Sequence, residues 1–148
     1  MLWISGTGHQ VQPILLDTGV IAACLNRRDF HHARCVAAMA QITQPLVTCE
    51  AVIVESFFLL QSDPSAVDDV LANVAGGIFQ IPFQLSACVS EVQQLLRKYR
   101  HTPCDFADAC LISMADQLDT GDILTLDSDF KHYRWRRTRR FRMLIPLD

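Results

Sequence analysis

The chain has 148 residues, of which half are hydrophobic and one fifth are charged, and its formal net charge is -3. This composition fits one folded domain with a sizeable core and excludes a chain dominated by disordered tails. No apolar run reaches the roughly 18 residues that span a bilayer, and residues 1–12 lack the features of a secretory signal. We therefore expect a cytoplasmic protein with no membrane association, an N-terminal extension over residues 1–12 and a single domain over residues 13–148.

The six cysteines contain no CxxC pair and lie within apolar patterns. We interpret them as buried, reduced thiols of a cytosolic protein rather than as a disulfide framework. The five histidines do not combine with them at the spacing of a zinc site.

The first half of the chain predicts strands that alternate with helices. A short buried strand is expected at residues 14–16, followed by a helix through residues 20–25 and a second helix over residues 30–42. Residues 46–48 favour a strand. The helix that follows, residues 49–61, is apolar on almost all sides, so we expect it to be deeply buried.

The second half continues this alternation. Helices are predicted over residues 64–75, 86–100 and 105–118, and strands over residues 78–81, 123–126 and 141–145, with a helical turn near residues 129–133. Parallel strands need helical crossovers, and these helices can cover both faces of a sheet. The sequence therefore predicts a three-layer α/β/α sandwich around a mostly parallel sheet of about five strands.

Residues 131–142, which we call the basic segment, carry most of the positive charge. Seven of the 13 Lys and Arg residues lie there without an acid among them, and Tyr133, Trp135 and Phe141 are interleaved. Such a segment can supply phosphate contacts and stacking faces for a nucleic acid. It can equally be a solvated loop that keeps an acidic domain soluble. The RNA-binding candidates are Lys131, Arg134, Trp135, Arg136, Arg137, Arg139 and Arg140.

Two aspartates, Asp17 and Asp127, follow predicted strands directly. Ligands of open α/β sheets bind beyond the carboxyl ends of the strands, so both side chains can face a crevice. For Asp17 a second interpretation is open, in which Asp17 or Thr18 caps the following helix. Asp129 is expected to cap the turn that begins at Phe130.

Two further acids, Glu55 and Asp108, lie within apolar helices. An ionised carboxylate there costs several kcal/mol unless it is paired or bound to a metal. Glu55 could instead point outward or pair with an Arg. Asp108 could complete a capping box with Asp105, three residues earlier, and this does not exclude a role in a site.

Four acids at one end of a sheet would repel one another unless a cation were present. A site with oxygen ligands only, without His or Cys, selects Mg²⁺ or Mn²⁺. Such a metal neutralises a phosphate and activates a water for in-line attack. Because no nucleophile with an adjacent base is evident, we expect direct attack by water.

The order of these residues resembles the PIN-domain ribonucleases, and most closely the toxin component of VapBC-type toxin–antitoxin modules. The resemblance rests on Leu16-Asp17-Thr18, on Thr48 with Glu55 seven residues later, on Ala107-Asp108-Ala109 and on the run from Thr125 to Phe130. It extends from about Ile14 to Pro146. No single motif is specific, but the four acids occur in the order that the family shows.

This resemblance implies an α/β/α fold and a Mg²⁺- or Mn²⁺-dependent endoribonuclease that acts on RNA, with a cognate antitoxin and a homodimer as expected partners. The implied catalytic residues are Asp17, Glu55, Asp108 and Asp127. Asp17 and Asp108 match the usual metal ligands, supported by Glu55, Asp127 and the accessory Asp129, while Thr18 and Thr125 match the pocket. Gly19 departs from the family, which commonly has Asn or Ser there.

Three alternatives remain. Asp17-Thr18-Gly19 resembles the catalytic triplet of aspartic proteases, although those enzymes are all-β. A haloacid-dehalogenase-type phosphatase would need a second Asp at the position of Gly19. The third alternative is a degenerate PIN-like module that binds RNA or a partner without cleaving.

Overall fold

The computed structural model describes residues 11–147, so most of the expected N-terminal extension, residues 1–12, lies outside the described residues. Five strands form one sheet in the order β3-β2-β1-β4-β7, and every neighbouring pair is parallel. The strands are β1 (Ile14–Leu16), β2 (Leu46–Val47), β3 (Phe79–Gln80), β4 (Asp122–Leu124) and β7 (Arg142–Met143).

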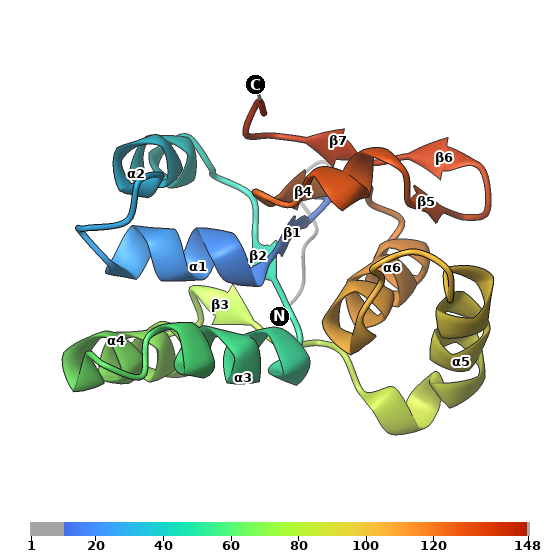
Figure 1. The fold of residues 1–148 in the computed structure, drawn as a ribbon, viewed down its shortest axis with the longest axis horizontal. Coiled ribbons are helices and arrows are strands. Elements are labelled where there is room, and N and C mark those ends of the chain that lie inside the picture. Colours follow the sequence, from blue (N-terminus) through green and yellow to red (C-terminus); the bar gives the residue numbers. More distant parts are fainter. Residues whose placement is uncertain (1–10, 148) are drawn as a thin grey trace.

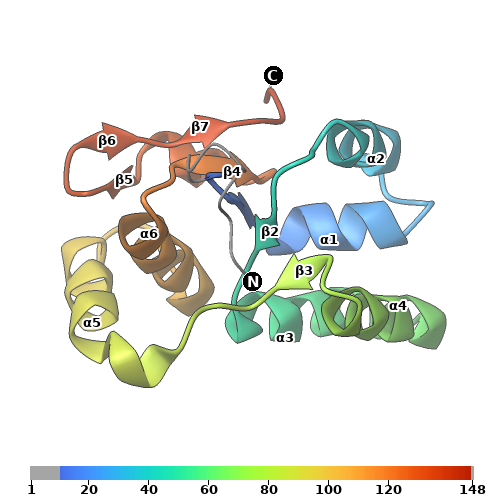
Figure 2. The ribbon, with the colours of Figure 1, turned by 180° about the vertical axis from the view of Figure 1, so that it is seen from behind.

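The helices cover both faces of this sheet. They are α1 (Thr18–Leu25), α2 (His32–Ala40), α3 (Glu50–Leu59), α4 (Pro64–Ala75), α5 (Val89–Lys98) and α6 (Phe106–Leu118), with 3-10 turns η1 (Leu85–Ala87) and η2 (Ser128–Lys131). Figure 1 shows α1 to α4 on one side of the strands and α5 and α6 on the other, and Figure 2 shows the same layers from behind. The predicted three-layer fold is confirmed.

The direction of the crossovers explains which helices share a face. The first two crossovers move outward from β1 to β2 and from β2 to β3, whereas the third returns from β3 to β4. Because crossovers between parallel strands are right-handed, reversing the direction of travel puts the connecting helices on the opposite face. Helices α5 and α6 therefore lie across the sheet from α1 to α4.

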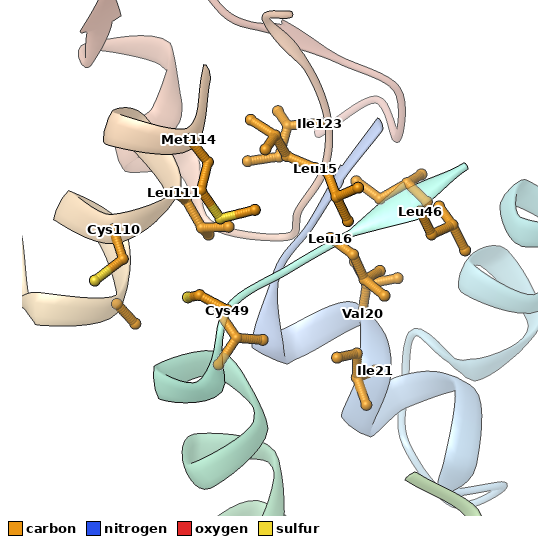
Figure 3. Close-up of a cluster of buried hydrophobic side chains, with 14 of the residues drawn as sticks. Leu15, Leu16, Val20, Ile21, Leu46, Cys49, Cys110, Leu111, Met114 and Ile123 are labelled. Carbon is orange, nitrogen blue, oxygen red and sulfur yellow. The ribbon is translucent and has the colours of Figure 1, made fainter. Parts of the chain in front are cut away.

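Strand β1 lies at the centre of the core. Leu15 and Leu16 are fully buried between β2 and β4, and Figure 3 shows them among side chains from α1 and α6. Burial of each such leucine stabilises the fold by roughly 1.5–3 kcal/mol. Since the next residue is Asp17, this packing fixes that aspartate at the middle of the carboxyl edge of the sheet.

The prediction that residues 49–61 form a deeply buried helix is wrong in part. Val52, Ile53 and Ser56 of α3 are buried, but Val54 and Phe58 are 65% and 69% exposed. The helix packs against α1, α4 and α6 on one side only. An apolar sequence cannot show this, because its other side is equally apolar.

The basic segment contains an antiparallel hairpin that the sequence did not predict. Strand β5 (Arg134–Trp135) pairs with β6 (Arg139–Arg140). Arg136 and Arg137, between them, have φ angles of 44° and 70°. Left-handed residues of this kind allow a tight turn, but the turn usually contains Gly or Asn, so two arginines give no turn signal.

All six cysteines are free, and four of them are buried, while Cys24 and Cys104 are half-buried. Among the residues that the structure describes, no helix is long and apolar enough to cross a membrane.

Candidate metal centre

Three carboxylates meet at the carboxyl edge of the sheet. One oxygen from each of Asp17, Asp108 and Asp127 lies within 4.8 Å of the other two. Asp17 follows β1, Asp127 follows the neighbouring parallel strand β4, and Asp108 lies in the first turn of α6. The pocket around them has a volume of about 300 Å³. Glu55 and Asp105 also line it.

Asp17 is held by two hydrogen bonds. The Thr18 amide donates to Oδ1 at 2.8 Å, and the Thr125 hydroxyl donates to Oδ2 at 2.7 Å. The first bond is the N-cap of α1, so the capping role and the site role coexist. Thr125 Oγ1 also accepts a bond from the Asp127 amide at 3.0 Å. This buried threonine therefore sets the positions of Asp17 and Asp127 together.

Asp108 is held by the predicted capping box. Its amide donates to Asp105 Oδ1 at 2.8 Å, and the Asp105 amide donates to Asp108 Oδ2 at 3.3 Å. The hydroxyl of the buried Tyr133 also donates to Asp108 Oδ2, at 3.2 Å. The sequence predicts only a stacking face for Tyr133. Nothing in the sequence connects it to an aspartate 25 residues earlier.

Glu55 lies beside the three aspartates. The Thr18 hydroxyl donates to Glu55 Oε2 at 2.9 Å. The observed partner of Glu55 is therefore a threonine, whereas the sequence allowed a pairing with an arginine. The side chain is half-buried, on the part of the pocket that α3 contributes. Thr18 therefore supports Glu55 from the first turn of α1.

The turn after β4 is capped by Asp127 rather than by Asp129. Asp127 Oδ1 accepts the Asp129 amide at 2.9 Å at the start of η2, so the expected cap by Asp129 is wrong. Asp129 itself is not among the described residues that line the pocket. Asp105 does line it, although the sequence predicts only a capping role for this residue. The sequence signal for Asp105 as a pocket residue was its position as a fifth acid, three residues before Asp108.

Burial and mutual repulsion disfavour the charged carboxylates. Burial raises the pKa of Asp17 despite its hydrogen bonds from Thr125 and Thr18. Burial, followed by the charges of Asp105 and Asp17, raises the pKa of Asp108 to about 8. Burial also raises the pKa of Glu55 and of Asp127.

These acids fit a divalent cation. The donor atoms are carboxylate oxygens, which Mg²⁺ and Mn²⁺ prefer, and a cation would offset the repulsion among them. The arrangement can also neutralise charge on a phosphate that enters the pocket.

Tyr133 of the basic segment reaches the pocket, but two arginines of the segment are held at the other end of α6. Arg136 pairs with Asp119, just beyond the last residue of α6, and Arg142 pairs with Asp122 at the start of β4. Asp108 and Asp119 are eleven residues apart along α6, which corresponds to roughly 16 Å of helix rise. The acids and the arginines therefore occupy opposite ends of the same helix.

The aromatic rings of the basic segment are buried. Trp135 is 7% exposed, its indole N–H donates to the Arg140 carbonyl at 3.2 Å, and the guanidinium groups of Arg136 and Arg139 lie over its ring. Arg134 Nη1 donates to three backbone carbonyls of the preceding turn. Trp135 thus links the two strands of the hairpin, and Arg134 ties the hairpin to the turn before it. The exposed cations of the basic segment are Lys131, Arg136, Arg137, Arg139, Arg140 and Arg142.

The acids of the pocket lie within a match to a known family. The PIN domain family matches residues 14–136, from the first residue of β1 into the turn of the hairpin. The chain belongs to the PIN-domain family. The resemblance inferred from the sequence is confirmed.

Individual proteins are similar to this PIN domain. "Ribonuclease VapC26" of Mycobacterium tuberculosis (strain ATCC 25618 / H37Rv) is 25% identical over 116 residues, which cover 77% of this chain and 86% of that protein. The crystal structure of Mycobacterium tuberculosis VapC20, described as a sarcin-ricin loop cleaving toxin, has a TM-score of 0.75 and 19% identity. It covers 85% of this chain and 98% of VapC20. The second similarity shows the shared fold.

The parallel α/β fold excludes the aspartic-protease interpretation of Asp17-Thr18-Gly19. Aspartic proteases are all-β, whereas here the triplet joins β1 to α1 of a parallel sheet. Asp17 therefore belongs to the carboxylate cluster rather than to a protease dyad.

Proposed function

We propose that this PIN-domain protein is an endoribonuclease that depends on Mg²⁺ or Mn²⁺ and acts as the toxin of a toxin–antitoxin pair. The observation that carries the proposal is the cluster of Asp17, Asp108 and Asp127, whose oxygens lie within 4.8 Å of one another in one pocket. The similarity to Ribonuclease VapC26 supports RNA as the substrate.

Asp17, Asp108 and Asp127 are the residues that would hold the cation. When bound, it supplies a Lewis acid that stabilises charge on the phosphate and lowers the pKa of water. Thr125 orients Asp17, and Tyr133 and Asp105 orient Asp108, so these ligands need little rearrangement. Glu55, oriented by Thr18, lies where its carboxylate can accept the proton of an attacking water.

RNA contact by the basic segment is part of the proposal. The exposed guanidinium groups of Arg137 and Arg140 can bind phosphates, whereas the buried Trp135 ring cannot serve as a stacking face in this conformation. Because these arginines lie near the far end of α6 from the acids, an RNA that contacts both must span roughly 16 Å. We therefore expect long RNA to use the basic segment more than a short oligonucleotide does.

Cleavage of a labelled RNA tests this function. The purified chain is incubated with RNA in EDTA, in Mg²⁺ and in Mn²⁺, alongside the Asp17→Asn variant. As a matched control, Asp68→Asn removes an exposed acid of α4. We expect cleavage only with metal, loss of cleavage in Asp17→Asn and wild-type cleavage in Asp68→Asn. Cleavage in EDTA or by Asp17→Asn would contradict the proposal and favour a contaminating nuclease.

Protein partners complete the proposal. We expect a homodimer, supported by the exposed apolar residues Val54, Phe58 and Leu59 on the outer side of α3, and a cognate antitoxin encoded in the adjacent reading frame. Light scattering coupled to size exclusion should give a dimer mass that Phe58→Glu converts to a monomer mass. Leu71→Glu, an equally apolar exposed position on α4, is the control. A cytoplasmic location stays a prediction.

A further inference from the structure

A second cavity lies beside the acid pocket along the carboxyl edge of the sheet. Its volume is about 460 Å³. Cys49 and Phe83, which follow β2 and β3, line this cavity, whereas Asp17 and Asp127, which follow β1 and β4, line the acid pocket. Because β2 and β1 are neighbouring parallel strands, the two cavities are adjacent on one edge of the sheet.

Helices α3 and α6 border both cavities. Asp105 lines the acid pocket and the next residue, Phe106, lines the second cavity, so about 3.8 Å separates their Cα atoms. On α3, Glu50 lines the second cavity, and Glu55 lines the acid pocket roughly 7.5 Å further along the helix. A phosphate in the acid pocket and a neighbouring base in the second cavity are therefore within reach of one RNA strand.

The second cavity has an apolar lining that is partly open to solvent. Cys49, Phe83 and Cys110 are buried and form its inner side, and Figure 3 shows Cys49 before α3 and Cys110 on α6. Leu85 and Phe106 are 41% and 44% exposed and lie at its opening. A flat apolar group can therefore enter from solvent and pack against an aromatic ring and an aliphatic side chain.

Three polar side chains at the opening can distinguish one flat group from another. Glu50, Gln84 and Ser86 line the cavity and are exposed. Glu50 carries the only charge among the described residues that line it. A carboxylate repels a phosphate but accepts hydrogen bonds from an amino group. The lining therefore favours an uncharged ring with an amino group over a phosphate.

We propose that this cavity binds one nucleobase of the RNA substrate and selects a base with an amino group on its Watson–Crick edge, an inference that rests on the proposed function. Adenine, cytosine and guanine have this amino group, and uracil lacks it. The base stacks on the Phe106 ring and packs against Leu85, while the Glu50 carboxylate accepts from the amino group. The adjacent phosphate enters the acid pocket. Phe106 and Glu50 thereby help to determine which phosphodiester bond is cleaved.

Binding without cleavage tests the base site separately from the nuclease. Asp17→Asn, in which Asn can still cap α1, is titrated in Mg²⁺ with short single-stranded RNAs that each carry one 2-aminopurine, a fluorescent base with an amino group. We expect the fluorescence at one position of the RNA to change on binding, because the base leaves solvent and stacks. In this background, Phe106→Ala should abolish the change, whereas Phe106→Tyr, which keeps a ring, should retain it. No change at any position, or an unchanged signal in Phe106→Ala, would overturn the proposal.

Cleavage preference tests the role of Glu50. Four RNAs that differ only at the base identified by fluorescence are compared by kcat/KM with the otherwise wild-type chain at saturating Mg²⁺. We expect the uracil RNA to be cleaved roughly tenfold less well than the other three, because uracil offers no amino group to the carboxylate. Glu50→Gln should largely remove this difference, since an amide both donates and accepts. Glu91→Gln, which changes an exposed acid in the first turn of α5, is the matched control and should keep the preference.

Further measurements separate a base contact from a structural effect at the start of α6. Mn²⁺ affinity, measured by calorimetry, should be the same in Phe106→Ala and in the wild-type chain. Leu85→Ala changes the other exposed apolar residue, which lies in η1 rather than in α6, and should also weaken the fluorescence change. Phe30→Ala is the control, because Phe30 is 93% exposed and is not among the described residues that line either cavity.

The outcomes distinguish this inference from the proposed function. A fluorescence change that depends on Phe106 and Leu85 in a chain that cleaves no RNA would support the base site and contradict only the proposed function. Metal-dependent cleavage with equal rates for all four RNAs would overturn base selection by Glu50. A wild-type signal in Leu85→Ala together with lost Mn²⁺ affinity in Phe106→Ala would overturn the base site and assign Phe106 to the structure of α6.

Discussion

Acids lie at both ends of α6, but only those at one end are paired with a positive charge. At the N-terminal end, Asp108 is buried beside Asp17 and Asp127, and all three have raised pKa values. At the C-terminal end, Asp119 is half exposed and already paired with Arg136. The first cluster lacks a compensating charge within the described chain, whereas the second is neutralised by the fold itself.

This difference in pairing distinguishes the charges that stabilise the fold from those that can bind a ligand. An exposed ion pair contributes about 0–1 kcal/mol and is satisfied in the folded state. Buried like charges destabilise the folded state until a cation binds. The carboxylates of the acid pocket therefore have no positive charge to balance them within the described chain. In contrast, several side chains of the basic segment bond to the backbone of that same segment.

The largest expected effect is a difference in RNA cleavage between substitutions of Asp108 and Asp119, which lie at opposite ends of α6. Asp108→Asn should lower RNA cleavage by about 100-fold or more, because it removes a carboxylate from the cluster. Asp119→Asn should change cleavage less than about twofold, because it removes only exposed ion pairs with Arg136 and Arg139. Initial rates at saturating Mg²⁺ provide the measurement. Similar losses in both variants would mean that the two ends of α6 do not differ as described.

A smaller effect is expected for Tyr133→Phe. The hydroxyl donates to Asp108 Oδ2, and the loss of such a supporting bond typically lowers metal affinity by roughly 10-fold to 100-fold. Mn²⁺ binding by isothermal titration calorimetry tests this prediction. Tyr99→Phe is the control, because the Tyr99 hydroxyl accepts from the Arg134 amide instead. Unchanged Mn²⁺ affinity in Tyr133→Phe would show that this bond does not orient the ligand.

Metal should stabilise the fold more at high pH than at low pH. Because the folded pKa of Asp108 is raised to about 8, its contribution to stability is complete below pH 4 and is lost as the pH rises toward 8. Metal binds the deprotonated form and compensates for this loss. The rise in melting temperature on adding Mg²⁺ should therefore be larger at pH 8.5 than at pH 6. In Asp108→Asn this difference should shrink, and an equal Mg²⁺ shift at both pH values would contradict the assignment.

The smallest effect concerns the far end of α6. Arg137→Ala with Arg140→Ala should weaken binding of a long RNA a few-fold and reduce the slope of log K against log salt by about 1.4–1.8, because two phosphate contacts are lost. Cleavage of a short oligonucleotide should be unchanged. Arg27→Ala with Arg28→Ala removes two exposed arginines outside the basic segment. If this control pair has the same effect, the basic segment has no special role in RNA binding.

Several features could be predicted from the sequence because they depend on neighbours in the chain. Strand β1 was predicted over residues 14–16, as observed, since an apolar run that stops at a carboxylate is a local pattern. The capping box of Asp105 and Asp108 has a fixed spacing of three residues. The order of the four acids was sufficient to indicate the family.

Other features were decided only by the tertiary structure, because they join residues that are far apart in the chain. The convergence of Asp17, Asp108 and Asp127 and the bond from Tyr133 to Asp108 each depend on how helices cross the sheet. The exposure of one side of α3 and the burial of the Trp135 ring were also decided by the tertiary structure. Sequence patterns state which side chains are available, whereas packing of distant segments decides which of them meet and which face solvent.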